Sequence, residues 1–422
     1  MVREMKDSGI EWIGEIPRCW HTSKLKYLGR YINGYAFKPE DWGSEGIPII
    51  RIQDLTGSTD RPNFFSGKID DKYLVKNGDI LVSWAATLDA FVWNKGTGWL
   101  NQHIFKAVPN EEKIDYSYFF WMIKESMKNM NNDNKHGIFM QHVTLDVFNN
   151  FSIPMPPLEE QRKIASFLDR KCAEIDSVIA DTQRTIEEYK KLKQSVITQA
   201  VTKGIRGERP MKDSEIEWVG QIPSEWDVVR IKTLFDYRNE RNNKPLEEVN
   251  LISLYTDKGV VQHCDLEETT GNKASNADGY KLVYQDDIVV NIILCWMGAI
   301  GRSSYSGVTS PAYDVYSPKP KTNSEFYHYY FRTSGFSGDC YKYGRGIMAM
   351  RWRTYSDEFR ALQVVCPSVE EQDEIVAYLD EKCDAIDRII AAKQQLIAEM
   401  EVYKKSVIYE YVTGKKEVPT CQ

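Results

Sequence analysis

Two stretches of the chain carry apolar or small residues at intervals that alternate between three and four positions. In the first stretch, Lys193 shares the register of Cys172, Ile175, Ile179, Thr182, Ile186, Tyr189, Val196 and Ala200. In the second, Lys393 and Lys404 share the register of Cys383, Ile386, Ile390, Ile397, Met400, Val407 and Tyr411. Alternation of three and four is the heptad pattern of a coiled-coil seam. The pattern therefore predicts two long helices, each with one apolar stripe.

The residues at the ends of these stretches fit helix boundaries. Pro156-Pro157 and Pro367 precede them, where proline is tolerated at a helix start. Gly204 and Gly414 follow them as predicted C-caps. An apolar stripe of this length must be buried, and the nearest partner of each helix is the other helix. Because a lobe precedes each helix in the chain, we expect an antiparallel pair with the lobes at opposite ends of a rod. Packing of each helix on its own lobe is the alternative.

The regions before the helices read as mixed α+β lobes of about 150 residues each. Strand-like runs occupy 47–52, 79–84, 250–254 and 287–294, and short helices are expected at 115–126 and 324–335. The predicted fold class is thus α+β: two globular lobes in tandem duplication, separated by two long helices that form an antiparallel coiled coil. The expected boundaries are 1–157 for the first lobe, 158–207 for the first helix, 208–366 for the second lobe, and 367–422 for the second helix and tail.

Short repeats show that the two halves are copies. MKDSGIEWIGEIP at 5–17 matches MKDSEIEWVGQIP at 211–223 in ten of 13 positions. LEEQRKIASFLDRKCAEID at 158–176 matches VEEQDEIVAYLDEKCDAID at 369–387 in ten of 19. Between these anchors the halves look largely unlike each other. The chain is therefore a duplication with constant ends and variable middles, and its period is far too long for a solenoid.

Composition is that of an ordinary globular chain, with 42% hydrophobic and 27% charged residues. The net charge of −7 is unevenly spread: residues 158–207 carry a net +2 and residues 367–422 a net −5. The eight cysteines are scattered without a Cys-x-x-Cys pair, which favours reduced thiols over disulfides or zinc. Cys172 and Cys383 are predicted to be small buried residues. No signal segment or long apolar run is visible, so a cytoplasmic location is expected.

The sequence contains no recognisable catalytic set. It has no phosphate-cradling loop, no dinucleotide fingerprint, and no metal-ligand spacing among the six histidines. His103 in LNQHIF is a candidate base without a partner, so a hydrogen-bonding or core role is favoured. The carboxylate pairs Glu159-Glu160 and Glu370-Glu371 stand at predicted helix starts, where they favour the positive end of the helix dipole. Metal ligation by these carboxylates is the weaker alternative.

Binding is the chemistry that remains. The stretch 128–143 combines amides with the predicted contact residues Lys135, His136, Gln141 and His142. The stretch 341–353 holds the equivalent place in the second half and supplies Lys342, Arg345, Arg351 and Arg353, with no acidic residue. Such side chains read base edges and hold phosphates. We interpret the two stretches as nucleic-acid contacts; a solvated loop with ordinary surface charge is the alternative.

Taken together, these features resemble the DNA-specificity subunit of type I restriction–modification systems. PPLEEQRKIASFLDRKCAEID, CPSVEEQDEIVAYLDEKCDAID, the duplicated IEWIGEIP and IEWVGQIP, GDILVS and LNQH carry the resemblance over essentially the full chain. It implies two target-recognition domains that each read half of a split DNA target. It also implies helices that set the gap and dock two methyltransferase subunits, and no catalysis by this chain itself.

The resemblance assigns cofactors to partners: S-adenosylmethionine to the methyltransferases, and ATP and magnesium to restriction and translocase subunits. It also adds Asn101, Gln102 and His103 to the candidate DNA contacts. The second half has SPAYDVY at the place of LNQHIF, so this role is not carried over to it. Two other readings remain: a scaffold that binds proteins through its lobes, and a nuclease with scattered carboxylates.

Overall fold

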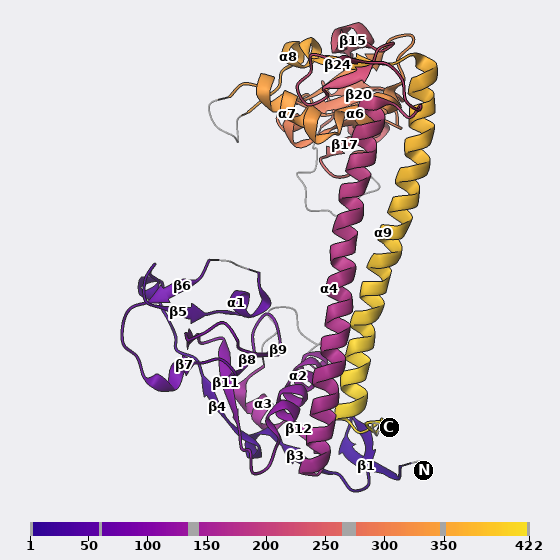
Figure 1. Cartoon of the computed structure of the whole chain (residues 1–422). Coiled ribbons are helices and arrows are strands. Elements are labelled where there is room, and N and C mark those ends of the chain that lie inside the picture. The colour runs from indigo at the N-terminus through magenta and orange to yellow at the C-terminus, as the bar shows by residue number, and fades with distance from the viewer. Residues whose placement is uncertain (1–2, 59–60, 134–142, 264–275, 347–351, 420–422) are drawn as a thin grey trace. The chain divides into compact units, whose positions relative to one another are not determined.

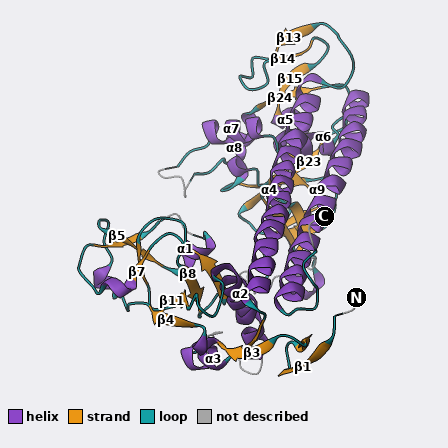
Figure 2. Ribbon diagram, turned by 60° about the horizontal axis from the view of Figure 1, so that its bottom comes forward, coloured by secondary structure: helices purple, strands orange, loops and turns teal. Residues whose placement is uncertain are grey.

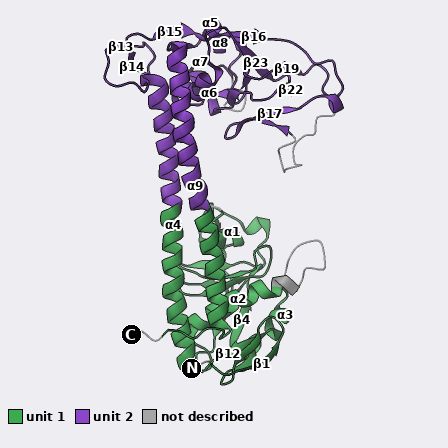
Figure 3. Cartoon of the chain, turned by 90° about the vertical axis from the view of Figure 1, so that its right-hand side faces the viewer, with its two compact units in different colours: residues 1–182, 395–422 green, residues 183–394 purple. Residues whose placement is uncertain are grey.

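The computed structural model describes residues 3–58, 61–133, 143–263, 276–346 and 352–419. The chain forms two compact units, Met1–Thr182 with Gln395–Gln422, and Gln183–Gln394 (Figure 3). Each unit therefore combines one lobe with a segment of both long helices. Predicted residues Lys135, His136, Gln141, His142 and Arg351 lie outside the described part of the chain.

Both predicted long helices are present (Figure 1). They are α4, Leu158–Lys203, and α9, Val369–Val412. Gly204 and Gly414 follow them with φ angles of +73° and +75°, as the C-cap prediction requires. Glycine is also needed there for space. A Cβ atom at Gly414 would lie 2.9 Å from Trp20 Cη2, because the end of α9 packs on the first lobe.

The predicted seam is confirmed in each unit. Every predicted seam position is buried or half-buried, while most positions between them are exposed. The buried ones are Ile175, Ile186, Ile386 and Val407, and the half-buried ones are Ile179, Val196, Ile390 and Ile397. The first turns of each helix also enter the core of their own lobe, including the buried Cys172 and Cys383. Packing on the lobe thus occurs alongside packing between the helices.

Two lysines that share the seam register are neutralised across it. In the first unit Lys404 Nζ lies 2.6 Å from Asp176, and in the second Lys193 Nζ lies 2.6 Å from Asp387. The two pairs are repeat equivalents. Each allows only one alignment of the antiparallel segments, because a slip of one turn would leave a lysine in an apolar seam without its carboxylate. The register of the pair is therefore specified twice.

The first lobe is built around two four-stranded sheets, ordered β6-β5-β10-β7 and β4-β11-β8-β9. Figure 2 draws the strands in orange and labels β5 and β7 of the first sheet and β4, β8 and β11 of the second. Helix α2 covers the second sheet beside β9. Its helices are α1 Ile52–Thr56, α2 Tyr116–Asp133 and α3 Leu145–Asn150. Its strands are β1 Met5–Ile10, β2 Gly14–Pro17, β3 His21–Lys24, β4 Gly29–Asn33, β5 Ile47–Ile50, β6 Asn63–Phe65, β7 Leu74–Val75, β8 Ile80–Ser83, β9 Asp89–Val92, β10 Gly98–Leu100, β11 Ile104–Pro109 and β12 Ser152–Met155.

The second lobe repeats the second of these sheets, in the order β16-β23-β20-β21. Its helices are α5 Ile231–Leu234, α6 Ser324–Phe331, α7 Ser334–Tyr343 and α8 Ser356–Ala361. Its strands are β13 Met211–Asp213, β14 Gln221–Pro223, β15 Asp227–Arg230, β16 Phe235–Arg238, β17 Ile252–Tyr255, β18 Gly259–Gln262, β19 Lys281–Val283, β20 Ile288–Asn291, β21 Ile300–Arg302, β22 Gly307–Thr309, β23 Tyr313–Pro318 and β24 Gln363–Cys366.

Several sequence-based boundaries were wrong. The expected helix 115–126 continues to Asp133, and the expected strand 250–254 begins at Ile252. The expected strand 47–52 ends at Ile50, and α1 begins at Ile52. The expected helix 324–335 is split after Phe331, because the Thr333 side chain accepts from Phe336 N and caps a new helix, α7. The expected strand 287–294 ends at Asn291, whose Oδ1 accepts from the backbone N–H groups of Ile293 and Leu294 and turns the chain.

One glutamate at the start of each long helix makes the same contacts in both units; Glu160 is half-buried and Glu371 is buried. In the first unit, Glu160 accepts hydrogen bonds from Trp20 Nε1 at 2.8 Å and Arg3 Nη2 at 2.5 Å. In the second unit, Glu371 accepts from Trp226 Nε1 at 2.9 Å and Arg209 Nη2 at 2.6 Å. In both, the arginine also lies over the tryptophan ring.

The next residue of each helix makes a second tie. The side chain of Gln161 donates to Pro156 O and accepts from Asp115 N. Gln372 makes the equivalent bonds to Pro367 O and Asn323 N. The Glu-Gln pair of each repeat therefore fastens a helix start to two separate parts of its lobe, a role that the helix dipole alone does not explain.

Glu371→Gln is expected to destabilise the second unit. The Glu371 side chain is only 1% exposed, and the substitution removes the closer of the two carboxylates that pair with the largely buried Arg209, while the half-exposed Glu225 stays at 2.8 Å. Complete loss of one partner of a buried pair costs about 3–5 kcal/mol, so a smaller loss of stability is expected with Glu225 still present. Chemical denaturation followed by circular dichroism measures the change. Glu370→Gln is the control, since Glu370 is exposed. Equal denaturation midpoints for the two variants would contradict the role given to Glu371.

Candidate nucleic-acid interface

The loop after the central strand occupies the same place in both lobes. This central loop covers residues 84–88 after β8 and residues 292–299 after β20. Trp84 O accepts from Val143 N at 2.9 Å, and Ile292 O accepts from Thr354 N at 3.0 Å. Each central loop is therefore joined to the segment just before the last short helix of its lobe. Val143 is the last residue of the first predicted contact stretch, and Thr354 directly follows the second.

The first lobe also brings Asn101, Gln102 and His103 to its central loop. The three residues form the turn between β10 and β11. The His103 ring lies 5.5 Å from the Trp84 ring, and Trp84 N donates to His103 O at 3.3 Å. Gln102 Nε2 and His103 Nε2 lie 3.3 Å apart. The turn thus carries an amide and an imidazole side by side, with His103 exposed to solvent.

Asn101 is arranged differently from its two neighbours. Its carbonyl group packs against the backbone at Gly34, where a Cβ atom would lie 2.0 Å from Asn101 O. Its side-chain Oδ1 is buried and has no hydrogen-bond partner in the described part of the chain. The backbone of Asn101 therefore shapes the turn, and Gln102 and His103 carry its accessible chemistry.

The described basic residues of the second lobe are held to different degrees. Lys342 lies 3.1 Å from Glu217, and Arg345 pairs with Glu358. Arg345 and Arg353 bond to each other through their backbones at 2.9 and 3.1 Å, which forms an antiparallel bridge. Arg353 is exposed, and its guanidinium has no partner among the described residues. Of the three predicted cations that the structure describes here, Arg353 is thus the one whose side chain is unpaired and available to a ligand.

Sequence reasoning missed an aromatic cluster beside this bridge. The Tyr341 ring lies 5.0 Å from Trp352 and 5.5 Å from Trp296, and Trp352 Nε1 donates to Tyr341 O. Met297 next to it is 53% exposed. The run 287–294 reads as one buried strand, so the turn at Asn291 that brings Trp296 and Met297 to the surface was not foreseen. Only Asn291 itself, a residue suited to turns, gave a signal.

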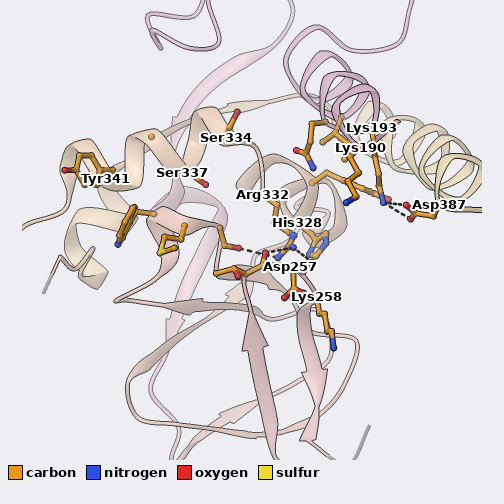
Figure 4. Close-up of a pocket in the computed structure, with 18 of the residues that line it drawn as sticks. Lys190, Lys193, Asp257, Lys258, His328, Arg332, Ser334, Ser337, Tyr341 and Asp387 are labelled. Carbon is orange, nitrogen blue, oxygen red and sulfur yellow. Dashed lines mark hydrogen bonds and ion pairs between the residues drawn. The ribbon is translucent and has the colours of Figure 1, made fainter. Parts of the chain in front are cut away.

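A groove of about 1180 Å³ adjoins the central loop within the second unit (Figure 4). Arg332, which follows α6, lies in its wall. Its guanidinium donates to four backbone carbonyls at 2.9–3.3 Å, those of Thr256, Asp257, Gly298 and Ile300. Desolvation lowers the pKa of Arg332. This one side chain ties the end of the central loop to the turn between β17 and β18.

His328, one turn earlier, supports the same wall. Its Nδ1 accepts from the backbone N–H of Arg302 at 3.1 Å. Desolvation, with Arg332 and Arg302 nearby, lowers the pKa of His328 to about 3. The ring is therefore neutral at neutral pH, which suits an acceptor role and excludes it as a cationic ligand contact there.

The first lobe anchors its central loop with another residue. Lys124 of α2 donates to both carboxylate oxygens of Asp89 at 2.8 Å and to Ala90 O at 3.2 Å. Asp89 directly follows the central loop. In both lobes a cation from the helix that covers the sheet fixes the far end of the loop, although the side chains and their partners differ. The two lobes thus hold the central loop at the same place, but with different side chains.

Comparison with known proteins gives one consistent family. The family model described as "Type I restriction modification DNA specificity domain" matches residues 17–188 and 223–401. The chain is 28% identical over 203 residues to the EcoBI specificity subunit of Escherichia coli, covering 47% of this chain and 42% of that one. It is 20% identical over 353 residues to the EcoDI specificity subunit of Escherichia coli, covering 77% and 76%. The chain thus spans less than half the length of the EcoBI relative.

Solved structures share the fold. A structure described under "complex assembly and conformational transition of the type I R-M system" superposes with a TM-score of 0.70 at 15% identity, covering 95% of this chain and 99% of that one. The HsdS subunit from Thermoanaerobacter tengcongensis superposes with a TM-score of 0.51 at 17% identity, covering 95% and 98%. In the described residues, no helix is long and apolar enough to cross a membrane.

Arg332→Met is expected to loosen the central loop of the second lobe. The substitution removes the donor shared by four carbonyls, and hydrogen bonds to a charged group contribute about 1.5–3 kcal/mol each. Hydrogen exchange should therefore become at least tenfold faster for amides of residues 292–300. Lys258→Met is the control, because Lys258 lines the same groove and is exposed. Unchanged exchange in Arg332→Met would show that the loop is held by other contacts.

Proposed function

The chain belongs to the family of type I restriction–modification DNA specificity subunits, and we propose that its two lobes each read one half of a split DNA target. In this proposal the helix pair sets the gap between the half-sites and docks two methyltransferase subunits. The observation that carries this proposal is that the two lobes share the same backbone elements but expose different side chains. The same four-stranded sheet, helix start and central loop recur, while the exposed side chains at the loop differ.

The exposed groups fit the reading of base edges. In the first lobe, the Gln102 amide can donate and accept at once, which is the pattern that adenine presents in the major groove. In the second lobe, the Arg353 guanidinium can donate two parallel hydrogen bonds, as guanine requires. Trp296 and Met297 offer apolar contact beside it. Two lobes with such different groups would select different bases, so the whole target would be asymmetric.

Docking of partners is supported by exposed apolar residues outside the seam: three at heptad spacing on α9, and two on α4 at the equivalents of the outer positions, with Thr185 at the middle one. Val178 and Leu192 on α4 are 45% and 48% exposed, and Ile389, Leu396 and Tyr403 on α9 are 38%, 37% and 46% exposed. Ile389, Leu396 and Tyr403 follow each other at intervals of seven residues, and Val178 and Leu192 are the repeat equivalents of Ile389 and Tyr403. A sustained heptad line on an exposed helix face fits an amphipathic helix of a partner.

Recurrence of two of these three apolar positions on α4 gives a reason for the constant ends of the chain. Two identical methyltransferases need two similar docking surfaces, whereas two different half-sites need two different lobes. The methyl donor S-adenosylmethionine would be bound by the methyltransferases. ATP and magnesium would be bound by restriction and translocase subunits. The part of this chain would be to place these partners on the DNA.

Methylome sequencing of cells that contain the chain and its methyltransferase tests the proposal. We expect a split motif with two fixed half-sites. Arg353→Ala should relax one half-site and leave the other unchanged, since loss of a bidentate contact to a base costs about 1–3 kcal/mol of discrimination. The double variant Gln102→Ala/His103→Ala should relax the other half-site.

Lys232→Ala is the matched control in the second lobe, because Lys232 is an exposed cation on α5, away from the central loop. It should leave both half-sites intact. A continuous motif, or a simultaneous change of both half-sites in Arg353→Ala, would contradict reading by separate lobes. Absence of any DNA binding by the assembled complex would favour the protein scaffold.

A further inference from the structure

The starts of the two long helices carry opposite charges at equivalent positions. On α4 the outward side of the first three turns presents Arg162, Lys163 and Arg170, which we name the basic face. On α9 the equivalent positions are Asp373, Glu374 and Glu381, which we name the acidic face. All six residues are exposed. The sign of the charge is reversed at all three positions, whereas many of the neighbouring helix residues are identical in the two repeats.

The basic face lines a groove in the first unit. The groove has a volume of about 680 Å³ and lies between the start of α4 and the tail residues Val418 and Pro419. Phe167 lies in its floor, half-buried against the Tyr411 ring at 4.4 Å. Lys163 pairs with Glu159 at 2.7 Å, while Arg162 and Arg170 have no side-chain partner among the described residues. Two unpaired guanidiniums therefore flank a partly apolar floor.

The acidic face has an excess of carboxylates that its own unit neutralises only in part. Glu374 pairs with Arg206 at 2.9 Å and remains 48% exposed. Glu381 has only a distant contact to Lys382 at 3.8 Å, and Asp373 accepts a hydrogen bond from the Asn323 amide. Negative charge thus remains available along the full length of the face.

The geometry of the two faces matches because they come from the same repeat. The outer charges are eight residues apart on both helices, at positions 162 and 170 on α4 and 373 and 381 on α9. That spacing corresponds to about 12 Å along a helix. Between them lie small exposed residues, Ser166 and Ala377, which permit close approach of two helices. Laid antiparallel, Arg162 meets Glu381 and Arg170 meets Asp373.

We propose that the basic face of one copy of this chain binds the acidic face of a second copy. The occupant is chosen by charge complementarity: the chain itself carries a surface of opposite sign, equal spacing and the same backbone geometry. Each copy has one face of each sign, so a pair of copies can make the contact twice when the symmetry closes. The charge reversal at these three positions also accounts for most of the difference in net charge between residues 158–207, at +2, and residues 367–422, at −5.

Such a contact is weak and depends on salt. Exposed ion pairs contribute little energy but steer and orient encounters. The screening length falls from about 10 Å at 0.1 M salt to about 3 Å at 1 M. Association should therefore be detectable at low ionic strength and high protein concentration, and should be lost when salt is raised.

Sedimentation velocity of the full chain over a concentration series tests the proposal. At about 0.05 M salt the wild type should associate, and at about 0.5 M it should sediment as a monomer. Arg162→Glu/Arg170→Glu should remove association, and so should Asp373→Arg/Glu381→Arg. The variant that combines all four changes should associate again, because it exchanges the signs of both faces. Lys191→Glu, at an exposed position farther along α4, is the control and should behave as wild type.

The result that overturns the proposal is a monomer at all salt concentrations, or association that the double variants leave unchanged. Failure of the fourfold variant to associate would do the same, provided that circular dichroism shows its helices intact. DNA binding is measured separately on the same variants with the methyltransferase present. It should be retained in all of them, so a failure of the proposed function is told apart from a failure of this contact.

Discussion

A carboxylate at the start of each long helix, half-buried in the first unit and buried in the second, is the interaction on which the rest of each unit depends. Glu160 and Glu371 accept from an indole and a guanidinium at once, and so join the helix to the repeated segment before the lobe. The C-terminal end of the other long helix packs against the same tryptophan in each unit. Gly414 at the end of α9 packs on Trp20, and Gly204 at the end of α4 packs near Trp226. Each unit is thus completed by both repeats.

This constraint explains why the repeats stay alike where they do. The Arg-Glu-Trp contacts, the Gln ties and the two Lys-Asp pairs across the seam all need a partner in a fixed register. The central loops do not need identical partners in the two lobes. A lysine of α2 holds the first loop through a carboxylate, and an arginine at the end of α6 holds the second through backbone carbonyls. A frame fixed in this way tolerates different side chains at the two central loops, as the proposed split and asymmetric target would require.

Much of the frame could be predicted from the sequence, because heptads, prolines, glycines and internal repeats act locally. The seam through Ile175 and Ile386 and the caps at Gly204 and Gly414 are of this kind. The role of Glu160 could not be foreseen, since its partners Arg3 and Trp20 lie more than a hundred residues away. Residues 101–103 were found through a resemblance. Trp296 was missed because a side-chain turn at Asn291 interrupts an apolar run.

The account is tested most directly by lengthening both helices together and sequencing the methylome. Four residues inserted after Gln183 in α4 and after Leu396 in α9 leave Asp176–Lys404 and Lys193–Asp387 within their own units. Each helix grows by about 6 Å, and B-DNA rises about 3.4 Å per base pair. The gap should therefore widen by one or two base pairs while both half-sites stay the same. An unchanged gap, or altered half-sites, would contradict the proposal that the helices set the gap and the lobes select the half-site sequences.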